Sequence, residues 1–228
     1  MIISIHQPNF IPWIGYFYKI AKSDTFVILD DVQFTKNSFI NRNKIKTPSG
    51  EQWLGIPIIQ SGKFGQNINQ CQIQNQEIHL SKITKSIKLN YAKCEFFDWL
   101  YPDLQTILNK KDQTLVSANV ALISTILNLL EIKTPFMLAS DLHNIEGEST
   151  ERLISICKEL NADKYLYGFG AKNYQEDELF RNAGIELKKN AFIHPDYKQL
   201  WGEFIPNLSI IDFLFNIGPE AIPFFKND

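Results

Sequence analysis

The sequence lacks the residue patterns of common metal sites and of familiar hydrolases. Its three cysteines, Cys71, Cys94 and Cys157, are far apart, and none stands in a zinc-ligand spacing. Scattered cysteines of this kind indicate reduced thiols with a structural role in a cytosolic protein. A Gly-x-Ser-x-Gly nucleophile elbow and a His-Glu-x-x-His motif are also missing. We therefore predict no metal site, and the sequence points to no particular cofactor.

An excess of one charge and long apolar runs are missing as well. The 228 residues include 23 Lys and Arg against 25 Asp and Glu, which gives a formal net charge of −2. This balance argues against nucleic acid as a partner. No stretch approaches the roughly 20 apolar residues of a membrane-spanning helix, and the first residues lack the basic and apolar regions of a signal peptide. We expect a cytoplasmic protein that does not insert into membranes.

A strand–loop–helix unit opens the chain and predicts an α/β fold. Two apolar, β-branched runs flank a helical segment, and such a unit forms a right-handed crossover between parallel strands. The same pattern returns in the second half of the chain. We therefore predict a Rossmann-like parallel sheet flanked by helices. The strands are expected at residues 2–6, 25–29, 135–139, 164–167 and 185–187, and the helices at 13–22, 150–160 and 176–182.

Two insertions are expected within a single α/β domain that spans residues 1–228. Residues 34–75 are rich in polar residues, proline and glycine, and predict strands and loops beside the main sheet, for which an edge hairpin is one arrangement. Within them, residues 68–73 alternate between polar and apolar as an exposed strand would. Residues 77–132 show helical periodicity without a strand and predict a helical lobe. Two short apolar helices are expected in the C-terminal tail.

Four of the predicted strands end in polar or glycine residues. Because parallel strands present their carboxyl ends at one edge of the sheet, we expect these residues to surround one crevice. His6 could act there as a general acid or base or could bind a phosphate or a sugar hydroxyl, or it could simply be satisfied by backbone. One of Asp30 and Asp31 could bind sugar hydroxyls or serve as a base, or could cap the next loop.

Further candidates lie outside these four strand ends. Arg42, in a predicted polar loop, could bind phosphate or carboxylate, or belong to a solvated surface. The pair Gly168 and Gly170 could admit a phosphate or form a tight turn. His194 precedes a proline, as in the opening motif, and could lie over the crevice or in a surface turn. The candidate catalytic residues are His6 and Asp30. The candidate substrate-binding residues are Gln7, Asp31, Asn41, Arg42, Ser140, Gly168, Gly170, Asn173, Tyr174, His194 and Tyr197.

Several motifs, spread over nearly the whole chain, resemble the WbqC-like proteins. They are found at residues 6–17, 27–34, 41–42, 53–57, 168–174, 194–197 and 208–212. The resemblance implies an association with gene clusters for O-antigen and other surface polysaccharides, without implying a reaction. The opening also resembles the strand–loop–helix unit of nucleotidyltransferases and pantothenate synthetase, but residues 12–16 lack the second histidine of that signature.

These observations lead to three hypotheses. The first is a transferase that acts on a nucleotide-linked amino sugar in surface-polysaccharide biosynthesis, by acyl or aminoacyl transfer from an activated donor. His6 would be the base, Asp30 would orient the acceptor, and Arg42 with residues 168–170 would hold phosphate. The second is a nucleotidyl or adenylyl transferase of related fold with magnesium, and the third a non-catalytic sugar-nucleotide-binding protein. The sequence leaves the donor, the sugar, a metal requirement and the oligomeric state open.

Overall fold

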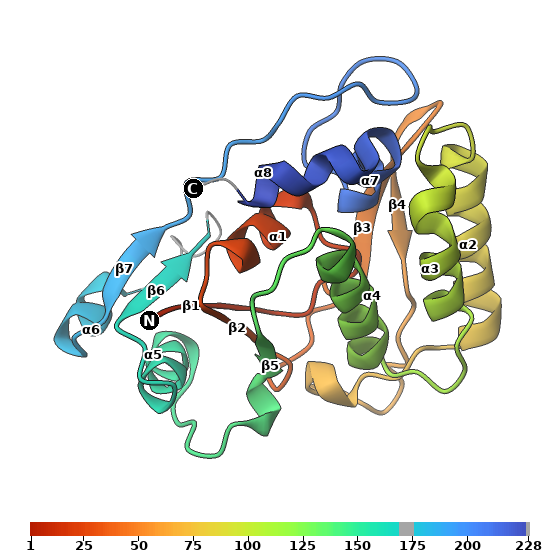
Figure 1. The fold of residues 1–228 in the computed structure, drawn as a ribbon. Coiled ribbons are helices and arrows are strands. Elements are labelled where there is room, and N and C mark those ends of the chain that lie inside the picture. Colours follow the sequence, from red (N-terminus) through yellow and green to blue (C-terminus); the bar gives the residue numbers. More distant parts are fainter. Residues whose placement is uncertain (169–175, 227–228) are drawn as a thin grey trace. The chain divides into compact units, whose positions relative to one another are not determined.

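The computed structural model describes residues 1–168 and 176–226 (Figure 1). Contacts within the chain divide it into two compact units. The first, called the sheet unit here, consists of Met1–Gln7, Tyr18–Asp31 and Lys133–Ile193. The second, called the helical unit, consists of Pro8–Phe17, Val32–Ile132 and His194–Asp228. Each unit is described by itself below.

The sheet unit contains a five-stranded sheet in which every pair of neighbours is parallel, as predicted. The strand order is β5-β2-β1-β6-β7, so the chain moves outward from β1 in one direction and then returns to build the other side. The point at which this order reverses lies between β1 and β6. The strands are β1 (Ile2–His6), β2 (Thr25–Ile28), β5 (Phe136–Leu138), β6 (Lys164–Tyr167) and β7 (Glu186–Lys189).

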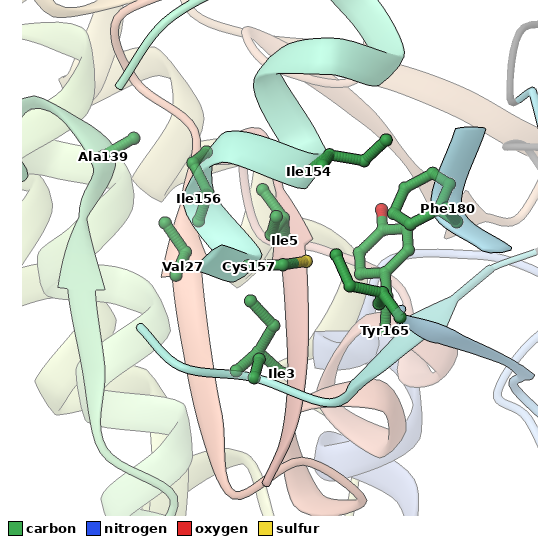
Figure 2. Packing of buried hydrophobic residues seen from close by; sticks show 11 residues of the cluster. Ile3, Ile5, Val27, Ala139, Ile154, Ile156, Cys157, Tyr165 and Phe180 are labelled. Atoms are coloured by element: carbon green, nitrogen blue, oxygen red, sulfur yellow. The ribbon is translucent and has the colours of Figure 1, made fainter. Parts of the chain in front are cut away.

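Side chains alternate across β1, so its two faces pack against different helices. Ile3 and Ile5 belong to a buried apolar cluster with Cys157 of α5 (Ser149–Glu159) and Phe180 of α6 (Asp177–Asn182). Figure 2 shows this cluster, with the Phe180 and Tyr165 rings beside each other. These rings are stacked with centroids 5.2 Å apart. The cluster fixes α5 and α6 on one face of the sheet.

The opposite face of β1 is polar at its centre. Ser4 is fully buried, and its Oγ lies 2.7 Å from Oγ of Ser23, which follows α1 (Ile14–Ala21). The Ser23 hydroxyl also donates to the carbonyl of Lys19, 2.8 Å away. These bonds fix the end of α1 against β1 on the face away from α5.

The helical unit contains a separate two-stranded antiparallel sheet and most of the longer helices. The helical character predicted for residues 77–132 is confirmed, since α2, α3 and α4 lie there. The predicted edge hairpin is also present as a hairpin, but its strands pair with each other and not with the main sheet. Its elements are β3 (Arg42–Thr47), β4 (Gly50–Gly55), α2 (Gln76–Tyr91), α3 (Phe97–Leu108), α4 (Leu115–Leu129), α7 (Ile210–Ile217) and α8 (Ile222–Lys226).

Two local predictions in this unit were wrong. Residues Ile68–Gln70 form a 3-10 helix instead of an exposed strand, because Ile68 and Cys71 both turn into the core. Arg42 to Lys44 lie on β3 and not in a polar loop. Asn43 is buried there, and its side-chain amide donates to the carbonyl of Ile11 at 2.8 Å.

The three cysteines are free and buried, as expected for structural thiols. Burial raises the pKa of Cys71 to about 11 and that of Cys94 and Cys157 to about 12. The thiols therefore stay protonated at neutral pH. Within the described residues, no helix combines the length and apolar character needed to cross a membrane.

Replacing Phe180 by alanine should destabilise the sheet unit strongly. Phe180 has no exposed surface, and Phe→Ala changes at such sites cost about 3–5 kcal/mol. Urea unfolding followed by circular dichroism would measure the loss. Phe64→Ala is the matched control because Phe64 is fully exposed, and it should change the free energy of unfolding by less than about 0.5 kcal/mol. Equal effects of the two changes would contradict the assigned core.

Candidate functional site

The sheet opens at its carboxyl edge between β1 and β6. β1 remains paired with β2 from Ile3 to His6. Its pairing with β6 ends much earlier, since no pair of described residues joins these two strands beyond Ile3 and Tyr165. This parting lies where the strand order reverses, the position at which ligands bind in open parallel sheets.

Lys19 of α1 occupies the opening between the two strands. The carbonyl of His6 accepts a hydrogen bond from the Leu29 amide on the β2 side, so the carbonyl of Ile5 faces the β6 side. The Lys19 Nζ donates to this Ile5 carbonyl at 3.0 Å. The Lys19 side chain is thus buried at the point where the ladder between β1 and β6 is interrupted.

His6 lies next to Lys19 on the same face of β1. Lys19 precedes Ser23 by one helical turn of about 5.4 Å, and His6 follows Ser4 by two strand residues, about 6.6 Å. Because Ser4 and Ser23 are in contact and α1 runs back along the sheet, these steps bring Lys19 beside His6. Burial and the neighbouring Lys19 lower the pKa of His6 to about 3. The imidazole is therefore neutral at physiological pH, and its Nδ1 lies 3.1 Å from the Gln7 carbonyl.

Burial also lowers the pKa of Lys19, to about 7. Among the residues that the structure describes, no carboxylate lies within ion-pair distance of its Nζ. A buried ammonium without a counter-ion is strongly disfavoured, so loss of its proton relieves the cost. One feature of the sequence indicates this position, because Lys19 is the only charged residue in the otherwise apolar α1.

Asp30 and Asp31 follow β2 and have different partners. Asp30 is 1% exposed, and its two carboxylate oxygens accept hydrogen bonds from the amide and the hydroxyl of Ser140, at 3.0 and 2.8 Å. Asp31 is half-buried and forms an ion pair with Arg152 of α5. Both carboxylates therefore belong to the carboxyl edge of the sheet. Arg152 was missed at the sequence level, because a single arginine on an amphipathic helix resembles a surface residue.

Asn41 and Arg42 lie in the helical unit. The Arg42 guanidinium stacks on the Trp53 ring at 4.1 Å, and the Asn41 amide donates to the Ile56 carbonyl at 3.0 Å. The neighbouring Phe39 and Trp53 rings are both exposed, with centroids 5.8 Å apart. Arg42 therefore lies on a cationic and aromatic surface of the hairpin.

His194 and Tyr197 are held by other groups of the helical unit. The Asn207 amide donates to His194 Nε2 at 3.1 Å. The Tyr197 hydroxyl donates to Asp212 at 2.9 Å, and the Tyr91 hydroxyl donates to the second oxygen of the same carboxylate at 2.9 Å. Burial raises the pKa of Asp212, while these two hydroxyls and Lys46 favour its charged form. This network fixes the segment that carries Tyr197.

The structure thus brings part of the predicted site together at one sheet edge and leaves the substrate-binding roles as predictions. The candidates in the sheet unit are His6, Gln7, Asp30, Asp31, Ser140 and Gly168. Those in the helical unit are Asn41, Arg42, His194 and Tyr197. Gly170, Asn173 and Tyr174 lie outside the described residues.

Comparison with known proteins identifies the family. A model of the WbqC-like protein family matches residues 7–223. The chain belongs to the WbqC-like protein family. The uncharacterized protein Rv1507c of Mycobacterium tuberculosis (strain ATCC 25618 / H37Rv) is 35% identical over 229 residues, which cover 98% of this chain and 97% of that protein. No solved structure matches this chain.

The stability of this WbqC-like protein should carry a pH dependence that comes from Lys19. The pKa of Lys19 falls from 10.5 to about 7 on burial, so between these pH values the unfolded chain binds more protons than the folded one. The free energy of unfolding should therefore rise with pH across this range, by up to about 1.4 kcal/mol per pH unit. Lys19→Met should remove this rise.

Urea unfolding of the wild type and of Lys19→Met at pH 7, 8, 9 and 10 would test this expectation. Lys22→Met is the matched control on the neighbouring turn, because the Lys22 ammonium lies over the Tyr18 ring at 5.5 Å instead of in the sheet opening. The control should keep the pH dependence of the wild type. If the free energy of unfolding rose equally with pH in the wild type and in Lys19→Met, Lys19 would not be the source of the pH dependence.

Proposed function

We propose that this WbqC-like protein is a transferase that acts on a nucleotide-linked amino sugar, by acyl or aminoacyl transfer to the amine. The observation that carries the proposal is the strand order, with its reversal between β1 and β6 and with His6 at the end of β1. Open parallel sheets of this order bind nucleotides at the reversal. The family resemblance adds the expectation of a role in surface-polysaccharide biosynthesis.

His6 supports an amine acceptor better than a hydroxyl acceptor. The Nδ1 proton is donated to the Gln7 carbonyl, so Nε2 carries the lone pair, and the low pKa keeps the ring in this form. An imidazole of such low pKa is a weak base. A neutral amine attacks a carbonyl carbon without prior loss of a proton and becomes acidic only in the tetrahedral intermediate. That proton is far more acidic than the proton of a hydroxyl acceptor, so its transfer to His6 as the leaving group departs is less unfavourable.

The two aspartates have separate roles in this proposal. Asp30 is nearly inaccessible, so it acts by fixing Ser140 at the end of β5 and thereby the wall of the site. Asp31 and Arg152 are closer to solvent, with side chains 18% and 19% exposed. Their ion pair offers an acceptor and a donor for hydroxyl groups of the ribose or the sugar.

Nucleotidyl transfer is the second candidate because it uses the same strand order. The neutral His6 could hydrogen-bond a phosphate in that reaction, as it could in a protein that binds without catalysis. The missing second histidine at residues 12–16 favours acyl transfer over nucleotidyl transfer. Ligand preference distinguishes the two reactions.

Nucleotide-linked amino sugars should stabilise the protein against heat. A ligand present at 100 times its dissociation constant adds about 2.7 kcal/mol to the free energy of unfolding. For a chain of this size, that corresponds to an increase in Tm of about 5–10 °C. Thermal unfolding would be followed with UDP- and dTDP-linked amino sugars, and with ATP and Mg²⁺ for comparison. Stabilisation by ATP and Mg²⁺ alone would favour nucleotidyl transfer and contradict the proposal.

His6→Ala should lower turnover about 100-fold or more, because a positioned acid–base group contributes at least this factor. Formation of the acylated sugar nucleotide would be followed by mass spectrometry with acyl-thioester and aminoacyl donors. The matched control is His143→Ala, since His143 is exposed, and it should retain full turnover. Undiminished turnover by His6→Ala would exclude His6 as the base. Binding of the sugar nucleotide without turnover of any donor would indicate a binding protein instead.

A further inference from the structure

Lys19 is a buried amine whose described neighbours supply no counter-charge when it is protonated. Its side chain is 4% exposed, and the Ile5 carbonyl is the only hydrogen-bond partner of its ammonium among the described residues. An ammonium has three N–H donors, so two of them have no protein acceptor there. Buried lysines are ordinarily paired with a carboxylate. This site therefore has the charge of an ion pair with one partner missing.

The two carboxylates that follow β2 have other partners. Asp30 receives two hydrogen bonds from Ser140, and Asp31 pairs with Arg152. Among the described residues, the other groups around Lys19 supply no negative charge. β1 presents His6, and β2 presents the Phe26 ring, whose centroid lies 5.8 Å from Nζ. Lys22, which follows α1 three residues after Lys19, lies over the Tyr18 ring. The missing partner is therefore an anion from outside this group of residues.

The position of the ammonium specifies the kind of anion. Lys19 lies where β1 and β6 part, at the reversal of the strand order, and this is where parallel sheets bind the phosphates of nucleotides. On the β6 side, the next residue after the strand is Gly168. A Cβ placed on Gly168 would meet no described atom within 4 Å. The Lys19 amine thus lies at the strand ends where the order reverses.

We propose that the Lys19 ammonium binds a phosphate group at the reversal point between β1 and β6 and holds the nucleotide-linked substrate beside His6. The choice of a nucleotide phosphate as ligand rests on the proposed function. The phosphate would accept hydrogen bonds from the two remaining N–H groups, while the Ile5 carbonyl keeps the third. Lys19 is then a substrate-binding residue and not the base.

Proton uptake on binding is a specific consequence of this arrangement. Since the pKa of Lys19 is about 7 in the empty site, most of the amine is neutral at pH 8. A bound phosphate favours the charged form and raises that pKa, so the complex takes up a proton from the buffer. The uptake at pH 8 should approach roughly 0.9 proton per site if the pKa rises well above 8. A lysine that merely fills space would not give this signal.

Isothermal titration calorimetry of the full chain at pH 8 tests the assignment. Titration with UDP, dTDP, ADP and inorganic pyrophosphate, in buffers that differ in ionisation enthalpy, gives both the affinity and the number of protons taken up. We expect uptake by the wild type with at least one probe. Lys19→Met and Lys19→Gln should lose it and bind that probe about 10–100-fold more weakly. Lys19→Gln can still donate to the Ile5 carbonyl, so it separates the loss of charge from the loss of that bond.

Matched controls make each outcome decisive. Lys22→Met should behave as the wild type, and thermal unfolding checks that every variant is folded. Unchanged affinity and proton uptake in the Lys19 variants would overturn the assignment. So would the failure of all four probes to bind the wild type, or uptake that disappears in His6→Ala but persists in Lys19→Met.

The titration and the transfer assay together separate the phosphate-binding role of Lys19 from the proposed reaction. Acyl transfer by the wild type, together with unchanged phosphate binding in the Lys19 variants, would contradict only the role of Lys19. Lys19-dependent proton uptake, together with no transfer from any donor tested, would contradict only the reaction.

Discussion

The early parting of β1 from β6 is the constraint on which the candidate site depends. β1 stays paired with β2 through His6 but is paired with β6 only as far as Ile3. In a continuous ladder the Ile5 carbonyl would accept a bond from the neighbouring strand, and no side chain could enter between the two. Here the carbonyl is left to Lys19, which brings a cation into the sheet edge beside a neutral histidine. Asp30 and Asp31, which follow β2, lie at the same carboxyl edge of the sheet on the other side of β1.

The buried carboxylates Asp30 and Asp212 accept hydrogen bonds on both of their oxygens, whereas the buried Lys19 has a single acceptor among the described residues. Asp30 is satisfied by Ser140 in the sheet unit, and Asp212 by Tyr91 and Tyr197 in the helical unit. Such groups stabilise a particular arrangement of segments, since removal of one donor would leave a buried charge exposed to a low dielectric. Lys19 has no corresponding set of acceptors among the described residues. The free-energy cost of burying its protonated form without acceptors is one that a bound anion can offset.

Much of the sheet unit could be predicted because its signals are local. β-branched runs gave the strands, and the parallel rule then placed His6, Asp30 and Ser140 at one edge. The strand prediction for residues 68–73 was wrong because the apolar residues Ile68 and Cys71 are three positions apart. This spacing fits a 3-10 turn as well as a loosely alternating strand. Lys19 was missed for a different reason. Its importance comes from the interrupted pairing of two strands, and neither their own residues nor those of α1 reveal where that pairing stops.

Because the three thiols are buried, their chemical modification measures how often the surrounding structure opens. Cys157 lies in the sheet unit, whereas Cys71 and Cys94 lie in the helical unit. Each thiol is both shielded and held in its protonated form, so a thiolate-directed reagent reacts only with molecules in which the surrounding structure has opened. The rate of modification at each cysteine therefore records the opening of its own unit. Modification of Cys157 therefore reports the opening of the sheet unit, which bears the candidate site, and modification of Cys71 and Cys94 reports the opening of the helical unit.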